Sequence, residues 1–170
     1  MEQLQKKLEK VEVQRTQMRR ARLRSELPRV ALVGYTNAGK STLFNALTGA
    51  EAFAADQLFA TLDPTVRMVT LPSKKKILLS DTVGFIRNLP TTLVKAFRAT
   101  LEEVTEAALL VHVVDGASEE AELAMAHVQT VLEEIGAQGT RQLVVWNKAD
   151  MPGFVGAPEG AARVSAAAGI

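Results

Sequence analysis

The amino-acid sequence predicts a three-layer α/β fold, in which a long basic helix precedes a mostly parallel sheet with one antiparallel edge strand. A glycine-rich loop lies between an apolar stretch of strand length and a segment with helical spacing. Apolar stretches and amphipathic segments then alternate, as in sheets covered by helices on both faces. Two further stretches are joined by a turn too short for a parallel connection. We therefore expect a charged linker helix over residues 1–27 and one α/β domain over residues 28–170.

The composition excludes several classes of protein. Lys and Arg number 20 and Asp and Glu 19, for a formal net charge of +1, so no global field selects nucleic acid or a membrane surface. The chain has no cysteine, which excludes a disulfide framework and a cysteine metal site and suits a reducing compartment. The first residues are charged, and no apolar run approaches the length of a membrane-spanning helix. We expect a cytoplasmic protein without a membrane span.

The central motif is a phosphate loop between a strand at residues 29–33 and a helix at residues 41–47. It matches G-x-x-x-x-G-K-[ST] at every defined position. Gly34 and Gly39 let the backbone curl around a phosphate, and the free N–H groups and helix N-terminus face the anion. Lys40 can reach the outer phosphates, and the Ser41 hydroxyl can bind Mg²⁺. The motif consists of Gly34, Tyr35, Thr36, Asn37, Ala38, Gly39, Lys40, Ser41 and Thr42.

The first 24 residues predict a long charged helix, which Pro28 separates from the first strand. Five arginines lie in its second half: Arg15, Arg19, Arg20, Arg22 and Arg24. Two interpretations remain open. The helix is either a solvated linker that docks loosely on the domain or a cationic arm that touches RNA phosphates.

A second motif follows a predicted hairpin. Residues 50–63 show little periodicity and indicate a loop, after which the strands 65–70 and 76–80 flank a short turn. The second strand leads into the D-x-x-G sequence of Asp81, Thr82, Val83 and Gly84. An aspartate at the end of a strand beside a phosphate loop can hold Mg²⁺ through water. The Gly84 N–H can sense a γ-phosphate. We therefore expect this motif to complete the phosphate site.

The remaining periodic segments predict two helices and two buried strands. The helices cover residues 93–104 and 119–135, the second capped by Gly136. A continuous apolar run at residues 107–114 predicts a parallel strand buried on both faces, with His112 as a packed core residue. The second buried strand covers residues 142–146, and a short last strand is expected within residues 163–167.

The strand at residues 142–146 leads into the N-K-x-D sequence of Asn147, Lys148, Ala149 and Asp150. The Asp150 carboxylate can accept both the N1–H and the exocyclic amine of guanine. Adenine offers no such donor pair and would leave the carboxylate unpaired, which disfavours an ATPase. Asn147 can bond the base and brace the phosphate loop, and the Lys148 stem can lie over the base. The motif therefore predicts a guanine nucleotide as the ligand.

Together these stretches resemble translation-factor-type GTPases and, more narrowly, the HflX family. The resemblance rests on residues 33–48, 59–65, 81–90, 93–104 and 147–150. It implies a P-loop GTPase fold, GTP and GDP as ligands, and hydrolysis of GTP with Mg²⁺. It also implies action on the large ribosomal subunit and its RNA, in splitting or rescuing stalled ribosomes. We expect a monomer.

The resemblance also assigns roles to individual residues. Thr61, within the stretch Phe59, Ala60, Thr61, Leu62 and Asp63, falls where the family's switch-I threonine binds Mg²⁺ and touches the γ-phosphate. Ser165 and Ala166 fall near its last guanine-binding motif. Asn37 matches an asparagine that holds K⁺ in some related GTPases, although its amide can instead tie the loop together. Phe85 stands where Ras-like proteins carry a water-positioning glutamine, so hydrolysis is expected to need a partner or an ion.

Two departures from the family pattern concern the C-terminal part. The stretch 151–160 is rich in helix breakers where the family has a helix, and the sequence ends before the final helix. The family's N-terminal domain also has no counterpart before the basic helix. These features predict a fragment or a truncated gene product. The alternative function is a non-catalytic guanine-nucleotide- or RNA-binding remnant of a GTPase domain.

Overall fold

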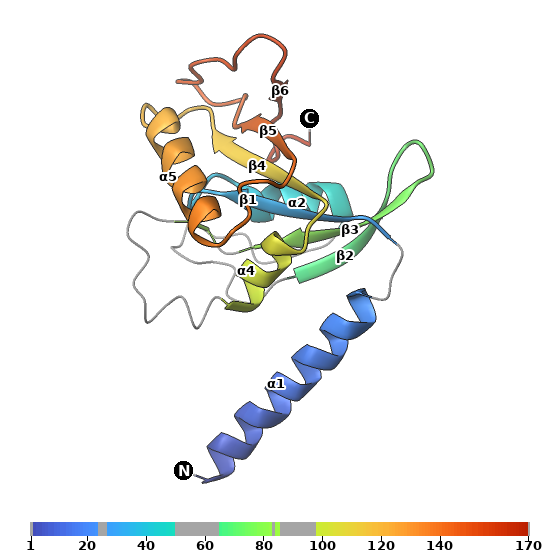
Figure 1. Ribbon diagram of the computed structural model, residues 1–170. Helices are drawn as coiled ribbons and strands as arrows, with labels where there is room; N and C mark the ends of the chain where they lie inside the picture. Colours follow the sequence, from blue (N-terminus) through green and yellow to red (C-terminus); the bar gives the residue numbers. More distant parts are fainter. Residues whose placement is uncertain (1, 24–26, 50–64, 83, 86–97, 170) are drawn as a thin grey trace.

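The computed structural model describes residues 2–23, 27–49, 65–82, 84–85 and 98–169. Its centre is a six-stranded sheet with the strand order β2-β3-β1-β4-β5-β6 (Figure 1). All pairings are parallel except that of the edge strand β2 with β3, as the sequence predicts. The strands are β1 (Arg29–Gly34), β2 (Thr65–Thr70), β3 (Lys76–Asp81), β4 (Leu109–Asp115), β5 (Gln142–Asn147) and β6 (Ala162–Arg163).

Helices cover both faces of this sheet and give the three expected layers (Figure 1). On one face, α2 (Lys40–Thr48) buries Leu43 and Phe44 in an apolar cluster with β1 and β3. On the other face, α4 (Arg98–Thr105) and α5 (Ala121–Glu134) bury apolar side chains against β1 and β4. The sheet is therefore apolar on both sides, which explains its continuous apolar strands.

The central strand β4 illustrates this double burial. Leu110 and Val113 belong to the clusters on opposite faces, and both are fully buried. His112 is also buried, as expected for a core residue. The strand begins at Leu109 rather than at residue 107, because Ala107 N still bonds to Val104 O of α4. The two alanines before Leu109 therefore belong largely to the turn out of the helix.

Several other predicted boundaries differ slightly from the structure. The helix expected over residues 93–104 overlaps α4, which ends one residue later at Thr105, and residues 93–97 lie outside the described part of the chain. The helix α5 lies within the expected range and ends just before Gly136, whose φ of 78° suits a helix terminus. The last strand was expected within residues 163–167, but β6 (Ala162–Arg163) is only two residues long and begins one residue earlier. Residues 151–161 form turns and no helix, as their helix breakers indicate.

The N-terminal helix α1 (Glu2–Leu23) extends away from the sheet (Figure 1). Every α1 side chain whose exposure is described is exposed, including the apolar Val11 and Val13. No helix among the described residues is both long enough and apolar enough to cross a membrane.

Candidate functional site

The carboxyl ends of four neighbouring parallel strands meet at one edge of the sheet. They are Gly34 of β1, Asp81 of β3, Asp115 of β4 and Asn147 of β5. This edge is where open α/β sheets bind ligands. The phosphate loop follows β1, the D-x-x-G sequence follows β3 and the N-K-x-D sequence follows β5, so the fold brings the three predicted motifs together.

The phosphate loop turns tightly between β1 and α2. Gly39 has a φ of 95°, and a Cβ there would lie 2.2 Å from Asn147 Nδ2, so both the backbone and the space require glycine. At Gly34 a Cβ would lie 2.4 Å from the Val113 carbonyl oxygen. From the sequence, we expected a glycine at position 34 because it lets a phosphate approach the backbone. In the structure, the neighbouring strand β4 occupies the space that a Cβ on Gly34 would need.

The Lys40 side chain lies beneath this loop, and only 6% of the residue is exposed. Its Nζ donates a hydrogen bond to the Tyr35 carbonyl oxygen at 3.2 Å. Burial lowers the pKa of Lys40 to about 8, although the nearby Asp81 charge opposes that fall. At pH 7 the ammonium group is therefore still charged, and it lies where it can contact an anion bound in the loop.

The two described metal-ligand candidates, Ser41 and Asp81, contact each other. The Ser41 hydroxyl donates to Asp81 Oδ2 at 2.6 Å, and Asp81 is buried at the end of β3. A hydroxyl and a carboxylate are oxygen ligands that suit Mg²⁺. No group of three or more His, Cys, Asp or Glu in the described part of the chain is arranged to hold a metal ion. The pair thus fits a Mg²⁺ that takes further ligands from water and nucleotide phosphates.

The buried amide of Asn147 joins three parts of the site. Its Nδ2 donates to the Ala38 carbonyl oxygen of the phosphate loop at 3.0 Å. Its Oδ1 accepts a hydrogen bond from Ala166 N, also at 3.0 Å. One side chain therefore ties the phosphate loop to β5 and to the segment after β6. This agrees with the expectation that Asn147 braces the loop.

Asp150 carries the carboxylate that is expected to bind the base. This residue is exposed, and Ser165 holds its side chain. The buried Ser165 hydroxyl donates to Asp150 Oδ1 at 2.5 Å and accepts a hydrogen bond from Ala168 N at 3.2 Å. Ser165 and Ala166 thus contact the N-K-x-D residues directly, although they lie beyond the short strand β6. A carboxylate fixed on one oxygen can present the other to a ligand's N–H groups.

The chain matches the protein family described as 50S ribosome-binding GTPase over residues 29–148. It belongs to this family. The matched range contains β1 to β5, the phosphate loop and the first residues of the N-K-x-D sequence.

Among curated relatives, this GTPase-family chain is similar to proteins named GTPase HflX, as its motifs predict. The HflX of Escherichia coli (strain K12) is 54% identical over 149 residues, which are 88% of this chain and 35% of that protein. The HflX of Magnetococcus marinus is 58% identical over 147 residues, 86% of this chain and 34% of that protein. The chain therefore spans about a third of the length of these relatives.

Solved structures show the same GTPase fold. A GTP-binding protein from the hyperthermophilic archaeon Sulfolobus solfataricus, in complex with GDP, has a TM-score of 0.58 and 33% identity, covering 92% of this chain and 42% of that one. Era from Aquifex aeolicus, solved with GDP and AlF4⁻, has a TM-score of 0.64 and 19% identity, and the match covers 85% of this chain and 52% of Era. At 19% identity the likeness to Era shows the fold alone.

Some predicted site residues of this GTPase-family chain lie outside the described residues. They are Val83 and the stretch Phe59, Ala60, Thr61, Leu62 and Asp63. The other predicted residues gather at the carboxyl edge of the sheet. Thr82 follows Asp81 there, and its hydroxyl donates to the Leu32 carbonyl oxygen at 2.5 Å. Ala149 N donates to the Val164 carbonyl oxygen at 3.1 Å, so the N-K-x-D turn is also fixed by the segment after β6.

Asp115 was not among the site residues expected from the sequence, although it directly follows the apolar run at residues 107–114. Asp115 Oδ2 pairs with Lys148 Nζ at 2.6 Å, and its Oδ1 accepts a hydrogen bond from Ala117 N at 3.0 Å. The pair is partly exposed, so we expect it to orient Lys148 more than to stabilise the fold. An aspartate at the carboxyl end of a central parallel strand was the available signal, since that edge holds the other motifs.

Phe154 supports this part of the site from outside. Its ring lies so close to the Gly116 backbone that a Cβ on Gly116 would be 2.1 Å from Phe154 Cε2. Val155 N donates to the Gly116 carbonyl oxygen at 2.9 Å, and Phe154 packs on a buried cluster that contains Trp146. The loop at residues 151–161 therefore covers an apolar surface of the GTPase-family sheet without forming a helix.

Phe85 and His112 both belong to the interior. Only 2% of Phe85 is exposed; its ring lies in the cluster under α4 and α5, and its N donates to the Gly34 carbonyl oxygen at 3.0 Å. Phe85 is thus a core residue rather than one that faces a reacting water. Burial, together with the nearby Lys40 charge, lowers the pKa of His112 to about 4, so its imidazole is neutral at pH 7. His112 lines a cavity of about 70 Å³ between the phosphate loop and α5.

Proposed function

We propose that this chain binds GTP and hydrolyses it in the presence of Mg²⁺, as a switch that acts on the large ribosomal subunit. The main support is that the phosphate loop, the Ser41–Asp81 pair and the N-K-x-D turn lie together at one edge of the sheet. The Asn147 amide joins the loop to the turn. The family description and the name GTPase HflX of the relatives support it. The separation into a linker helix at residues 1–27 and a GTPase domain at residues 28–170 is part of the same proposal.

In this proposal the phosphates lie in the loop at the N-terminus of α2. The loop N–H groups and the Lys40 ammonium stabilise the phosphoryl oxygens as negative charge shifts during in-line attack by water. The Gly84 N–H contacts the γ-phosphate. Ser41, Asp81 and Thr61 would hold Mg²⁺, which supplies charge neutralisation on the phosphates when bound. Lys40, Thr61 and Gly84 are thus the residues that we assign to the reaction.

In the proposed complex, the guanine base lies beside the N-K-x-D turn. The carboxylate of Asp150, held by Ser165, accepts two N–H groups from guanine, and Asn147 and Lys148 border the ring. The segment at Ser165 and Ala166 closes the base site from the side of β6. Adenine would leave the Asp150 carboxylate without its donors, which disfavours binding.

Hydrolysis is expected to be slow in the isolated chain. Phe85 is buried in the core and has no group that can orient a water molecule. A partner or an ion must therefore supply part of the stabilisation, and the large ribosomal subunit is the partner that we propose. We also propose that the chain works as a cytoplasmic monomer.

The test of this function is GTP turnover with and without purified large ribosomal subunits. We expect slow Mg²⁺-dependent turnover alone and at least about tenfold faster turnover with large subunits, because partner-supplied groups commonly accelerate GTPases much further. Small subunits serve as the matched control, and Ser41→Ala should lack the Mg²⁺-dependent activity. Tight GDP binding without turnover under any condition would support the non-catalytic alternative instead.

A further prediction concerns K⁺ and the Asn37 side chain. Asn37 is exposed in the phosphate loop with a φ of 61°, and no hydrogen bond joins its side chain to the residues that the structure describes. If its carbonyl holds K⁺ beside the phosphates, turnover in K⁺ should exceed turnover in Na⁺ by about tenfold. Asn37→Ala should remove this difference while GDP affinity changes less. Wild-type turnover that ignores the cation, or a variant that keeps the full preference, would refute the K⁺ role.

A further inference from the structure

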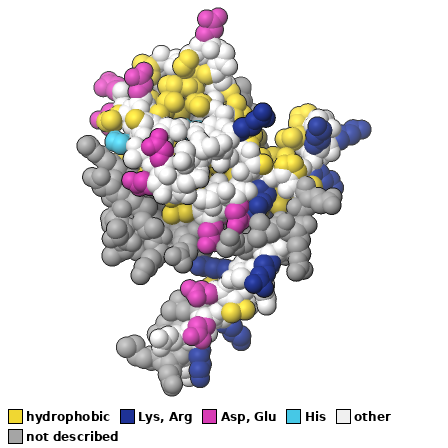
Figure 2. Space-filling view, in the orientation of Figure 1, with side chains coloured by type: hydrophobic (Ala, Val, Ile, Leu, Met, Phe, Trp, Pro, Cys, Tyr) yellow, Lys and Arg dark blue, Asp and Glu magenta, His cyan; other side chains and the backbone are white. Residues whose placement is uncertain are grey.

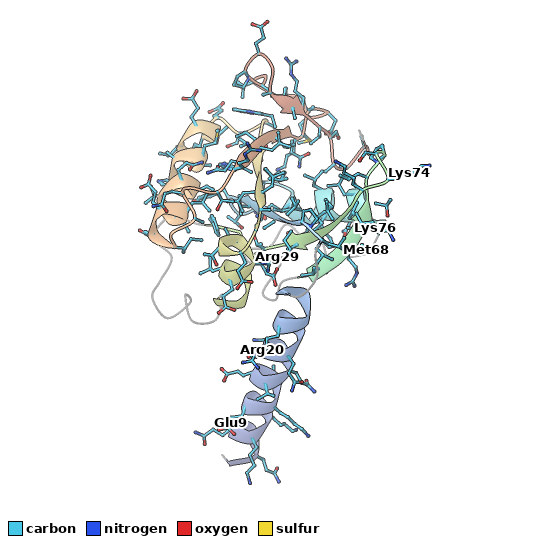
Figure 3. The ribbon with its side chains drawn as sticks, turned by 45° about the vertical axis from the view of Figure 1, so that its right-hand side comes forward. Glu9, Arg20, Arg29, Met68, Lys74 and Lys76 are labelled. Atoms are coloured by element: carbon cyan, nitrogen blue, oxygen red, sulfur yellow. The ribbon has the colours of Figure 1, made fainter. Side chains whose placement is uncertain are left out.

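Three consecutive lysines, which we call the lysine tip, lie in the turn between β2 and β3 and at the start of β3: Lys74, Lys75 and Lys76. All three are exposed, and none of their ammonium groups makes a hydrogen bond or ion pair with a residue that the structure describes. Figure 3 shows Lys74 and Lys76 at the outer end of the hairpin, beyond Met68 of β2. Within the described chain, these cations are thus open to a partner.

The hairpin holds the lysine tip in a defined backbone conformation. Lys74 N donates to the Leu71 carbonyl oxygen, and Leu71 N to the Lys75 carbonyl oxygen, both at 2.8 Å. Lys74 has a φ of 63°, a conformation that glycine or asparagine adopts at lower cost. The position therefore carries a cation although its backbone favours another residue, and strain of this kind often accompanies a functional contact.

Charge is distributed unevenly over the molecule. Residues 65–80 contain Arg67 and the three lysines but no Asp or Glu, whereas residues 119–135 contain five Glu and no Lys or Arg. Figure 2 shows these basic and acidic side chains on opposite sides of the domain. The formal net charge of +1 thus conceals a strongly basic end. Such an end attracts and orients a polyanion even when the whole chain is nearly neutral.

We propose that the lysine tip contacts RNA phosphates when the chain binds the large ribosomal subunit, an inference that rests on the proposed function. Lysine ammonium groups are compact point charges that pair with phosphates without a shaped pocket. Residues 65–80 contain no aromatic side chain of the kind that anchors a protein in a membrane interface. A tip of three residues is also far smaller than the roughly 20 to 30 residues that each partner contributes to a stable protein interface.

The lysine tip is remote from the nucleotide. Lys76 begins β3 and Asp81 ends it, so five residues of extended strand, or about 17 Å, separate the tip from the Ser41–Asp81 pair. Neutralising the tip should therefore leave GDP affinity unchanged. This separation lets one variant distinguish RNA contact from nucleotide binding.

The experiment compares two triple variants that remove equal charge. One is Lys74→Gln, Lys75→Gln and Lys76→Gln, and its control on α1 is Lys6→Gln, Lys7→Gln and Lys10→Gln. Affinity for purified large subunits and for protein-free ribosomal RNA is measured over a series of KCl concentrations, and GDP affinity monitors folding. We expect the tip variant to bind at least about tenfold more weakly near 0.1 M salt. The slope of log K against log salt concentration should also be smaller in magnitude by about 2 to 3. The α1 variant should lose less than about threefold.

Other outcomes separate this inference from the proposed function. If wild type binds subunits and the tip variant binds equally well, or the α1 variant loses as much, the inference is overturned and the proposed function stands. If wild type binds protein-free RNA through the tip but not subunits, the contact of the tip with RNA is supported, whereas its place on the large subunit and the ribosomal part of the proposed function are overturned. If wild type binds neither, both fail. Tip-dependent binding to phosphatidylserine vesicles without tip-dependent binding to RNA would also overturn the inference.

Discussion

The variant Asp150→Asn is expected to prefer xanthine over guanine nucleotides, with a change in the GDP-to-XDP affinity ratio on the order of 10³. Xanthine carries a carbonyl where guanine carries its amine, and an amide can donate to that carbonyl. The structure favours the required orientation, because the Ser165 hydroxyl that donates to Asp150 Oδ1 can donate equally to the asparagine oxygen. The amide nitrogen then takes the place of the other carboxylate oxygen. Titration calorimetry with GDP, XDP and ADP measures the ratio.

Asp115→Asn is the matched control for this exchange. It is the same chemical change at the end of the neighbouring strand, where the carboxylate pairs with Lys148 at 2.6 Å. We expect it to weaken nucleotide binding modestly without making xanthine the preferred base. If the wild-type chain binds ADP as tightly as GDP, or if both variants shift the preference equally, Asp150 does not read the base.

Lys40→Ala should weaken GDP and GTP binding by about 30- to 150-fold, which corresponds to a loss on the order of 2–3 kcal/mol from a charge-assisted phosphate contact. The effect is large because Lys40 is almost fully buried beneath the loop and no solvent competes with the contact. Its pKa of about 8 means that the measurement belongs at pH 7, where the wild-type ammonium is charged.

Two controls separate charge from packing in this prediction. Lys40→Met removes the charge but keeps most of the stem, so it should lose nearly as much affinity as Lys40→Ala while unfolding at a temperature close to that of wild type. Lys10→Ala removes an exposed cation from α1 and should leave the affinity unchanged. Wild-type affinity in both Lys40 variants would exclude the phosphate loop as the nucleotide site.

Local sequence patterns determined the elements and their order. The continuous apolar runs of β4 and β5 identify strands buried on both faces, and the short turn before Lys76 requires an antiparallel pair at the edge. The three motifs each follow a strand. Because parallel strands end at one edge, their meeting there could be expected from the sequence. The helix breakers in residues 151–160 likewise indicated that the helix found there in the family is absent.

The sequence by itself therefore determined the fold and the types of group that gather at the site, because these depend on short-range periodicity and on motif spacing. The family followed from resemblance over longer stretches, such as residues 81–90 and 93–104. Only the tertiary structure decided the contacts between distant segments. It placed the Val113 carbonyl against Gly34, paired Asp115 with Lys148 and seated Phe154 on Gly116. Such contacts depend on strand register and side-chain packing, which no local pattern encodes. The folded chain also separated its charges into a basic hairpin end and an acidic α5 side, a property that the net charge conceals because it sums over all positions.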